Sequence, residues 1–214
     1  MPKETFFRIK SERRERILNA AIHEFSEHGY SDASVNRILS EANIAAGSFY
    51  QYFEDLKDLF YHITFVMVTE KNRYMQDAVK ELVNPDLETF IRALYKGGIK
   101  FSVENERYVK IGNHFMRMQH SEIYHELVKI MPKSDIFNWL GEMVAKAIER
   151  KEIKEGVTPT LFMMLFMNVN TTIVEYMMLS SQKSFDFAGI DLDVLTELAV
   201  DLLLSGVKNK EGNL

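Results

Sequence analysis

The chain has 214 residues, enough to bury a hydrophobic core in one or two domains. It contains no cysteine, which excludes a disulfide framework, a thiolate nucleophile and a cysteine zinc site and makes the cytoplasm the default compartment. The formal net charge of -5 argues against a protein that binds a polyanion over its whole surface. No cofactor and no metal site are predicted.

The first 16 residues differ from this acidic average. They carry six basic and three acidic side chains, a net charge of +3. A basic segment on an acidic protein is compatible with DNA binding through one face, with an affinity that falls steeply as salt is added. The segment has no apolar stretch of signal-peptide length, so secretion is not expected.

A first helix is predicted from Ser11 to His28, with Gly29 as its C-terminal stop. Its buried stripe repeats at helical spacing and comprises Ile17, Leu18, Ala21, Ile22 and Phe25. Arg13, Arg14 and Arg16 fall on its first turns. Each arginine either lies on a solvated helix face or contacts a phosphate, and the sequence leaves both alternatives open.

Two short helices separated by a tight turn follow, within about residues 33–52. Ser34 is the N-cap type of residue before an apolar stripe made by Val35, Ile38, Leu39 and Ala42. Asn43 suits the left-handed conformation that ends many helices. The second helix, Ala45 to Tyr52, turns small or hydrogen-bonding side chains outward and Phe49 inward. This arrangement, two helices joined by a tight turn with only small or hydrogen-bonding side chains on the outer face of the second, lets that helix approach the major groove of DNA.

The run ANIAAGSFYQYFEDLKDLF, residues 42–60, resembles the signature of tetracycline-repressor-type (TetR/AcrR) transcriptional regulators. The residues in register are Ala42, Gly47, Ser48, Phe49, Tyr50, Tyr52, Phe53 and Leu59. The resemblance covers about residues 11–70. Two departures affect phosphate contacts: Ala45 replaces the usual serine cap, a loss of roughly 1 kcal/mol, and the usual lysine falls at Leu56, with Lys57 one place later.

The resemblance implies DNA contacts at Ser34, Arg37, Ser48, Tyr50 and Tyr52. Gln51 is the candidate for a base contact, because an amide can pair bidentately with adenine. The alternative for Tyr50 and Tyr52 is packing between the motif and the next helix. The predicted DNA-binding residues are Ser34, Arg37, Ala45, Ala46, Gly47, Ser48, Tyr50, Gln51, Tyr52 and Lys57.

A long helix is predicted from Asp55 to Val83, about 40 Å at 1.5 Å per residue. Asp55 and Asp58 resemble a capping box at its start, and Asn84-Pro85 ends it. We place a DNA-binding domain at residues 1–55 and an effector-binding and dimerisation domain at residues 56–214.

The remainder predicts helices over about residues 86–104, 107–119, 121–131, 134–151, 159–182 and 191–208. The fold class is therefore all-α, with an N-terminal three-helix helix-turn-helix domain, a C-terminal helical domain and about nine helices in total. The stretch 161–179 is the only membrane candidate, but it contains Glu175 and several amide and hydroxyl side chains, so an interface helix is favoured.

Aromatic and methionine side chains are abundant in the C-terminal part, where most of them fit an ordinary core. The resemblance implies an effector pocket there, for which we predict Phe101, His114, Met118, Trp139, Phe166 and Asn170. It also implies a four-helix dimer interface, for which we predict Leu165, Ile173, Met177, Leu195, Leu198 and Leu202. The alternative is that these residues are buried only against their own chain.

These patterns predict a DNA-binding regulator: a homodimeric, ligand-responsive repressor that binds a palindromic operator and is released by a small, largely apolar effector. An activator on the same fold remains an alternative. So does a helical small-molecule-binding protein or enzyme without a DNA-binding role. Enzyme chemistry has little support, because Glu122-x-x-His125 has no second copy that would complete a di-iron site.

Overall fold

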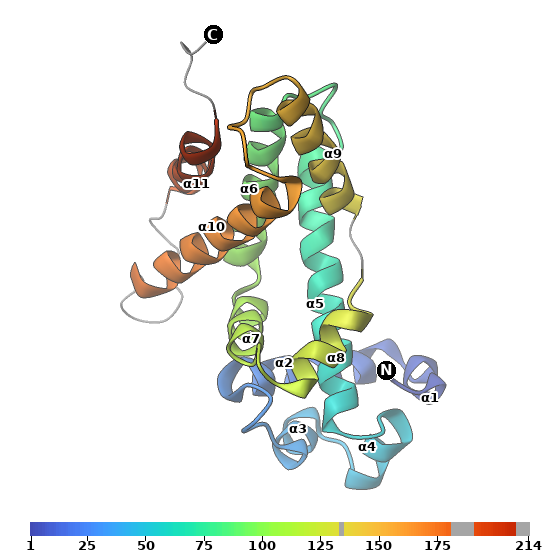
Figure 1. The fold of residues 1–214 in the computed structure, drawn as a ribbon. Helices are drawn as coiled ribbons and strands as arrows, with labels where there is room; N and C mark the ends of the chain where they lie inside the picture. Colours follow the sequence, from blue (N-terminus) through green and yellow to red (C-terminus); the bar gives the residue numbers. More distant parts are fainter. Residues whose placement is uncertain (133–134, 181–190, 209–214) are drawn as a thin grey trace. The chain divides into compact units, whose positions relative to one another are not determined.

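The computed structural model describes residues 1–132, 135–180 and 191–208, and in these ranges it contains eleven α-helices and no strand (Figure 1). The ranges predicted from the sequence correspond to ten of these helices, so the total of about nine was too low, and the shortest helix, at the N-terminus, was missed. The helices are α1 Glu4–Arg8, α2 Ser11–His28, α3 Val35–Ala42, α4 Ala46–Tyr52, α5 Leu56–Val79, α6 Leu87–Glu104, α7 Glu106–Arg117, α8 Glu122–Ile130, α9 Asp135–Glu149, α10 Pro159–Ser180 and α11 Leu192–Val207.

The helices pack into two compact units. Unit 1 consists of Met1–Glu70 and Asn105–Pro132, and unit 2 consists of Lys71–Glu104 and Lys133–Leu214. Helix α5 therefore contributes to both units. This division by packing assigns α7 and α8 to the same unit as the helix-turn-helix, whereas the functional boundary after residue 55 remains a prediction.

Helices α2 and α3 end at the residues that the sequence indicated. Asn43 adopts the left-handed conformation, with φ 51° and ψ 56°, and Gly29 has φ 65°. A Cβ atom on Gly29 would lie 2.9 Å from Nδ1 of His114, so a side chain would clash there. Ser34 occupies the N-cap position of α3, but its hydroxyl makes no capping hydrogen bond.

Helix α5 begins as predicted and ends earlier. The Asp58 N–H donates to Oδ1 of Asp55 at 2.8 Å, while Oδ2 of Asp58 accepts from the Glu54 N–H at 3.2 Å. The two aspartates thus act as a capping pair, with the return bond shifted by one residue. The helix stops at Val79 and not at Val83, because the chain tightens into a turn before Asn84, whose φ is 46°.

The core of unit 1 is built from phenylalanines. Phe6 on α1 lies 4.8 Å, centroid to centroid, from Phe53 after α4, and Phe25 on α2 lies 5.0 Å from Phe60 on α5. All four rings and Phe49 are completely buried. Aromatic burial therefore joins α1, α2, α4 and α5, which fixes the orientation of the helix-turn-helix.

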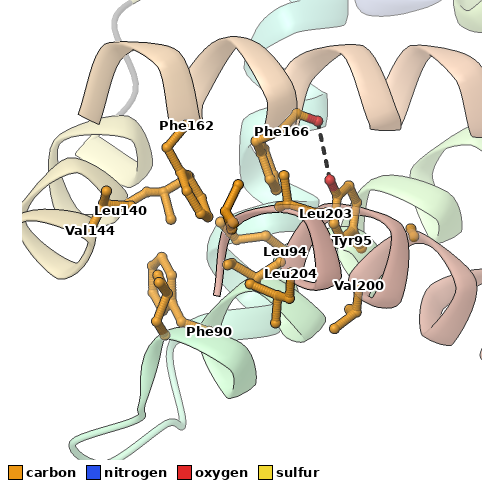
Figure 2. Packing of buried hydrophobic residues seen from close by; sticks show 14 of the residues in the cluster. Phe90, Leu94, Tyr95, Leu140, Val144, Phe162, Phe166, Val200, Leu203 and Leu204 are labelled. Atoms are coloured by element: carbon orange, nitrogen blue, oxygen red, sulfur yellow. Dashed lines mark hydrogen bonds between the residues drawn. The ribbon is translucent and has the colours of Figure 1, made fainter. Parts of the chain in front are cut away.

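The core of unit 2 gathers side chains from α6, α9, α10 and α11 (Figure 2). The ring of Tyr95 on α6 lies 4.8 Å, centroid to centroid, from that of Phe166 on α10 in a tilted arrangement, and its hydroxyl donates to the Phe166 carbonyl at 3.2 Å. Gly97 lets α6 approach α5, since a Cβ there would lie 2.8 Å from the Tyr74 carbonyl oxygen. None of the helices in the described ranges has both the length and the hydropathy of a bilayer-spanning segment.

Candidate nucleic-acid interface

The outer face of α4 is bare, as the sequence predicted. Ala45, Ala46 and Gly47 are exposed, and a Cβ built on Gly47 meets no atom within 4 Å. Tyr50, 60% exposed, and Gln51 place a hydroxyl and an amide on the same short helix. Such a surface lets a helix backbone come close to base edges while two side chains remain able to form hydrogen bonds.

Arg37 is engaged within the protein. Its Nε and Nη2 lie 2.9 Å and 2.5 Å from Oε1 of Glu24, and Nη2 also donates to the Asp32 carbonyl at 2.6 Å. Glu24 is only 5% exposed, and the same Oε1 accepts the Ser34 N–H at 2.6 Å. The carboxylate therefore ties the start of α3 to α2. Two residues predicted to contact DNA therefore also hold the motif together, Ser34 through its backbone N–H and Arg37 through its guanidinium group.

This carboxylate links the stability of unit 1 to pH. Burial alone would raise the pKa of Glu24, but the hydrogen bonds from Arg37 and from the Ser34 N–H outweigh it, so the pKa is lowered. In the unfolded chain the pKa of this glutamate is about 4.3, so its carboxylate binds a proton more tightly there than in the folded protein. The stabilisation is thus present at neutral pH and is lost as the pH falls below about 4.3.

We expect Glu24→Gln to lower the free energy of unfolding by roughly 2 kcal/mol at pH 7. This value is smaller than that for a fully buried ion pair, because Arg37 is about half exposed and solvent screens its charge. Between pH 6 and pH 3 the wild type should lose more stability than the variant, as followed by urea denaturation. Glu41→Gln, which breaks an exposed contact with His23, is the matched control and should change stability by about 0.5 kcal/mol or less. Equal acid sensitivity of wild type and Glu24→Gln would contradict the assignment.

Tyr52 and Ser48 correct the predicted geometry. Tyr52 is 4% exposed and its ring lies 6.0 Å from that of Phe6, so it belongs to the core and not to the groove-facing surface. The reason is helical spacing, because Tyr52 follows Phe49 by three residues and shares its inner face. Ser48 accepts a hydrogen bond from Nη2 of Arg13 at 3.2 Å. Tyr50 points outward, so the packing alternative applies to Tyr52 only.

Lys57 is also paired. Its Nζ lies 3.1 Å from Oε2 of Glu126 on α8, and that oxygen also accepts the Tyr61 hydroxyl at 2.5 Å. The bonds from Tyr61 and Lys57 lower the pKa of Glu126, which keeps the pair ionised at neutral pH. A phosphate contact by Lys57 would have to compete with this pair.

Helix α1 is the element that sequence reasoning missed. Its backbone and side chains satisfy the last carbonyls of α4: the Lys3 N–H donates to Tyr52 O at 2.8 Å, Lys3 Nζ donates to Tyr50 O at 2.8 Å, and the Thr5 hydroxyl donates to Gln51 O. The sequence signal for this helix was Glu4 with Arg8 four residues later, a helical ion pair observed at 2.6 Å.

Beneath α1 lies a buried histidine, His62. Its ring centroid lies 5.7 Å from that of Phe6 and 6.1 Å from that of Phe7. Burial and the nearby N-terminal ammonium group lower its pKa, against the opposing effect of Asp58. The imidazole is therefore neutral at pH 7, and α1 packs on an uncharged surface.

The predicted effector residues are divided between the two units. Phe101 and Phe166 are buried in unit 2, where Asn170 has its Oδ1 3.3 Å from the position of a Cβ on Gly98. His114 and Met118 belong to unit 1, and Nε2 of His114 lies 3.2 Å from the Ser26 carbonyl oxygen.

Trp139, also predicted to line the pocket, lies in unit 2. It is 46% exposed, because the core stripe of α9 is formed by Ile136, Leu140 and Val144, and Trp139 lies about a quarter turn away from it.

The predicted dimer residues divide into two groups. Leu165, Leu198 and Leu202 are exposed, whereas Ile173 and Leu195 are buried in the core of their own chain, which corrects the prediction for these two. The side chain of Met177 lies outside the described residues. Further exposed apolar side chains lie on the same two helices, at Leu161, Met164, Met167 and Tyr176 of α10 and Val194 of α11.

Helix, turn and bare second helix, supported by α2 and by the start of α5, define a helix-turn-helix DNA-binding protein. Residues 17–63 match the family model described as bacterial regulatory proteins, tetR family. This stretch is therefore a tetR-type DNA-binding domain, and the chain is a DNA-binding transcriptional regulator. The matched residues comprise most of α2, all of α3 and α4, and the beginning of α5.

One curated relative matches nearly the whole chain, and another matches about half of it. The fatty acid metabolism regulator protein of Bacillus subtilis is 24% identical over 204 residues, which cover 91% of this chain and 95% of that protein. An HTH-type transcriptional regulator of Staphylococcus aureus is 31% identical over 120 residues, 54% of this chain and 63% of that protein.

Two crystal structures share the fold, each with a TM-score of 0.71. A TetR family transcriptional regulator from Chloroflexus aurantiacus is 22% identical, with 98% of this chain and 100% of that chain covered. The regulator FadR from Bacillus subtilis, in complex with stearoyl-CoA, is 21% identical, and the match covers 90% of this chain and 98% of that chain.

Proposed function

We propose that the protein is a homodimeric repressor that binds a palindromic operator through α4 and leaves it when a long-chain acyl-CoA binds unit 2. The observation that carries the DNA-binding part is the bare, exposed face of α4. Ala45, Ala46 and Gly47 allow close approach to the bases, Gln51 hydrogen-bonds a base edge, and Tyr50 donates to a phosphate. The lack of large side chains on this face favours specificity shared between thymine methyl contacts and DNA shape.

The exposed apolar side chains of α10 and α11 support the dimer. Leucine and methionine side chains at helical spacing are exposed along both helices, and on α11 Val194, Leu198 and Leu202 form one stripe at intervals of four residues. A two-fold symmetric pairing of these helices covers both surfaces and presents two copies of α4 to half-sites about one helical turn, roughly 34 Å, apart.

The effector assignment rests on the relatives. The B. subtilis relative is a fatty acid metabolism regulator, and a structural neighbour was solved with stearoyl-CoA. The chemistry of unit 2 suits an acyl chain, because Met143 and Met163 pack at the margin of its aliphatic and aromatic core, and methionine adapts its shape to apolar ligands. We place the acyl chain near Phe101, Phe166 and Asn170, on α6 and α10.

The effector proposal is tested by operator release. Genomic fragments captured by the purified protein supply the operator, and fluorescence anisotropy then follows its release. Stearoyl-CoA is expected to raise the apparent Kd of the operator at least about tenfold, a coupling of about 1.4 kcal/mol. Free CoA at equal concentration is the control and should have no effect. Equal affinity with and without stearoyl-CoA, or equal release by free CoA, would disprove an acyl-CoA effector.

A further inference from the structure

The helix-turn-helix lacks free positive charge. Residues 34–57 contain two basic and three acidic side chains, a net charge of -1. Both basic groups are ion-paired, Arg37 with Glu24 at 2.5 Å and Lys57 with Glu126 at 3.1 Å. Binding to duplex DNA depends largely on cations that neutralise phosphates. The cations that this binding requires must therefore come from elsewhere in unit 1.

The N-terminal segment supplies them. Lys3, Lys10 and Arg14 have no carboxylate within 4.0 Å anywhere in the described ranges, which distinguishes them from Arg37 and Lys57. Lys3 and Lys10 are exposed and Arg14 is half-buried. These three charges are available to an external anion.

Their positions follow from the docking of α1 on α4. Lys3 Nζ lies 2.8 Å from the carbonyl oxygen of Tyr50, so its charge lies beside the residues proposed to contact DNA. Lys10 is the N-cap residue of α2, and Nη1 of Arg14 donates to the Phe7 carbonyl at 3.2 Å at the end of α1. The buried ring of Phe6 holds this segment against Tyr52 and Phe53. Free cations thus extend from the C-terminal end of α4 along α1 to the first turn of α2.

We propose that α1 and the first turn of α2 form a second DNA-binding element, in which Lys3, Lys10 and Arg14 contact the phosphates that flank the groove entered by α4. The inference rests on the proposed function, since it assumes that α4 enters the groove. It assigns the main electrostatic contacts to a part of the chain outside residues 17–63, the part matched by the family. Phosphate contacts of this kind add affinity for every sequence and no base preference.

The test is the salt dependence of operator binding by the triple variant Lys3→Gln/Lys10→Gln/Arg14→Gln. Glutamine keeps a donor for the Tyr50 carbonyl, so α4 stays capped. The slope of log K against log salt should become less steep by about 0.9 for each phosphate contact removed. Affinity at low salt should fall at least about tenfold, equally for operator and unrelated DNA.

Two control variants show whether a changed slope comes from the loss of these particular charges or from damage to the fold. Lys129→Gln/Lys146→Gln/Arg107→Gln removes the same charges from exposed positions on α8, α9 and α7 and should retain the wild-type slope. Lys3→Arg/Lys10→Arg/Arg14→Lys preserves charge and should also retain it. A wild-type slope in the first triple variant overturns the inference, as does an equal change in the control. If the wild type itself shows no preference for any site, the proposed function fails instead.

Discussion

Gly47→Glu is expected to lower operator affinity at least about 100-fold without lowering the stability of the protein. The new side chain would project from the bare face of α4 into open space, since no atom lies within 4 Å of its Cβ. In the DNA complex it would occupy the groove and place a carboxylate beside phosphates. In the free protein the change should be neutral or stabilising, because an acidic residue near a helix N-terminus is favourable and glycine is a poor helix former.

Gly141→Glu is the matched control. Gly141 is also helical, on α9, and a Cβ placed on it likewise has no atom within 4 Å. This variant has the same change in charge and size but should bind the operator like the wild type. Binding would be measured by anisotropy and stability by thermal denaturation. Undiminished operator binding by Gly47→Glu would show that α4 does not enter the groove.

The double variant Leu198→Glu/Leu202→Glu is expected to convert the dimer into a folded monomer and to raise the Kd for the operator about 100-fold or more. The two side chains are 43% and 55% exposed on α11, so the isolated chain tolerates charge there. In a two-fold interface each glutamate would be buried without a partner, a cost of several kcal/mol. A monomer then loses the advantage of binding two half-sites at once.

Met116→Glu/Val128→Glu is the control for the dimer. These side chains are 45% and 48% exposed and lie on α7 and α8, which are not the proposed interface helices. Sedimentation equilibrium should give a dimer mass for the wild type and for this control, and a monomer mass only for the α11 variant. A monomeric wild type at high concentration would contradict the dimer.

Local patterns predicted the motif and the helix ends well. The apolar stripe of α3, the left-handed Asn43 and the stop at Gly29 are short-range properties, and the structure contains all three. The small exposed residues of α4, Ala45, Ala46 and Gly47, were also predicted correctly, whereas Tyr52 was wrongly placed on the outward face. The sequence was sufficient to predict the apolar periodicity of these helices and the residues at which they end.

Long-range partners were not predictable in the same way. Nothing near Arg37 in the sequence indicates that Glu24 neutralises it, since the pair spans 13 residues and depends on how α2 packs on α3. Lys57 and Glu126 are 69 residues apart. Helix α1 was missed for a related reason: five residues form a stable helix only where Phe6 finds a core to enter.

The most direct test is selection of genomic fragments by the wild type and by Gly47→Glu in parallel. The wild type should enrich one sequence with two inverted half-sites whose centres lie about one helical turn, roughly 34 Å, or a multiple of it apart, and Gly47→Glu should enrich none. Capture by both proteins that is sensitive to salt but indifferent to sequence would contradict the account.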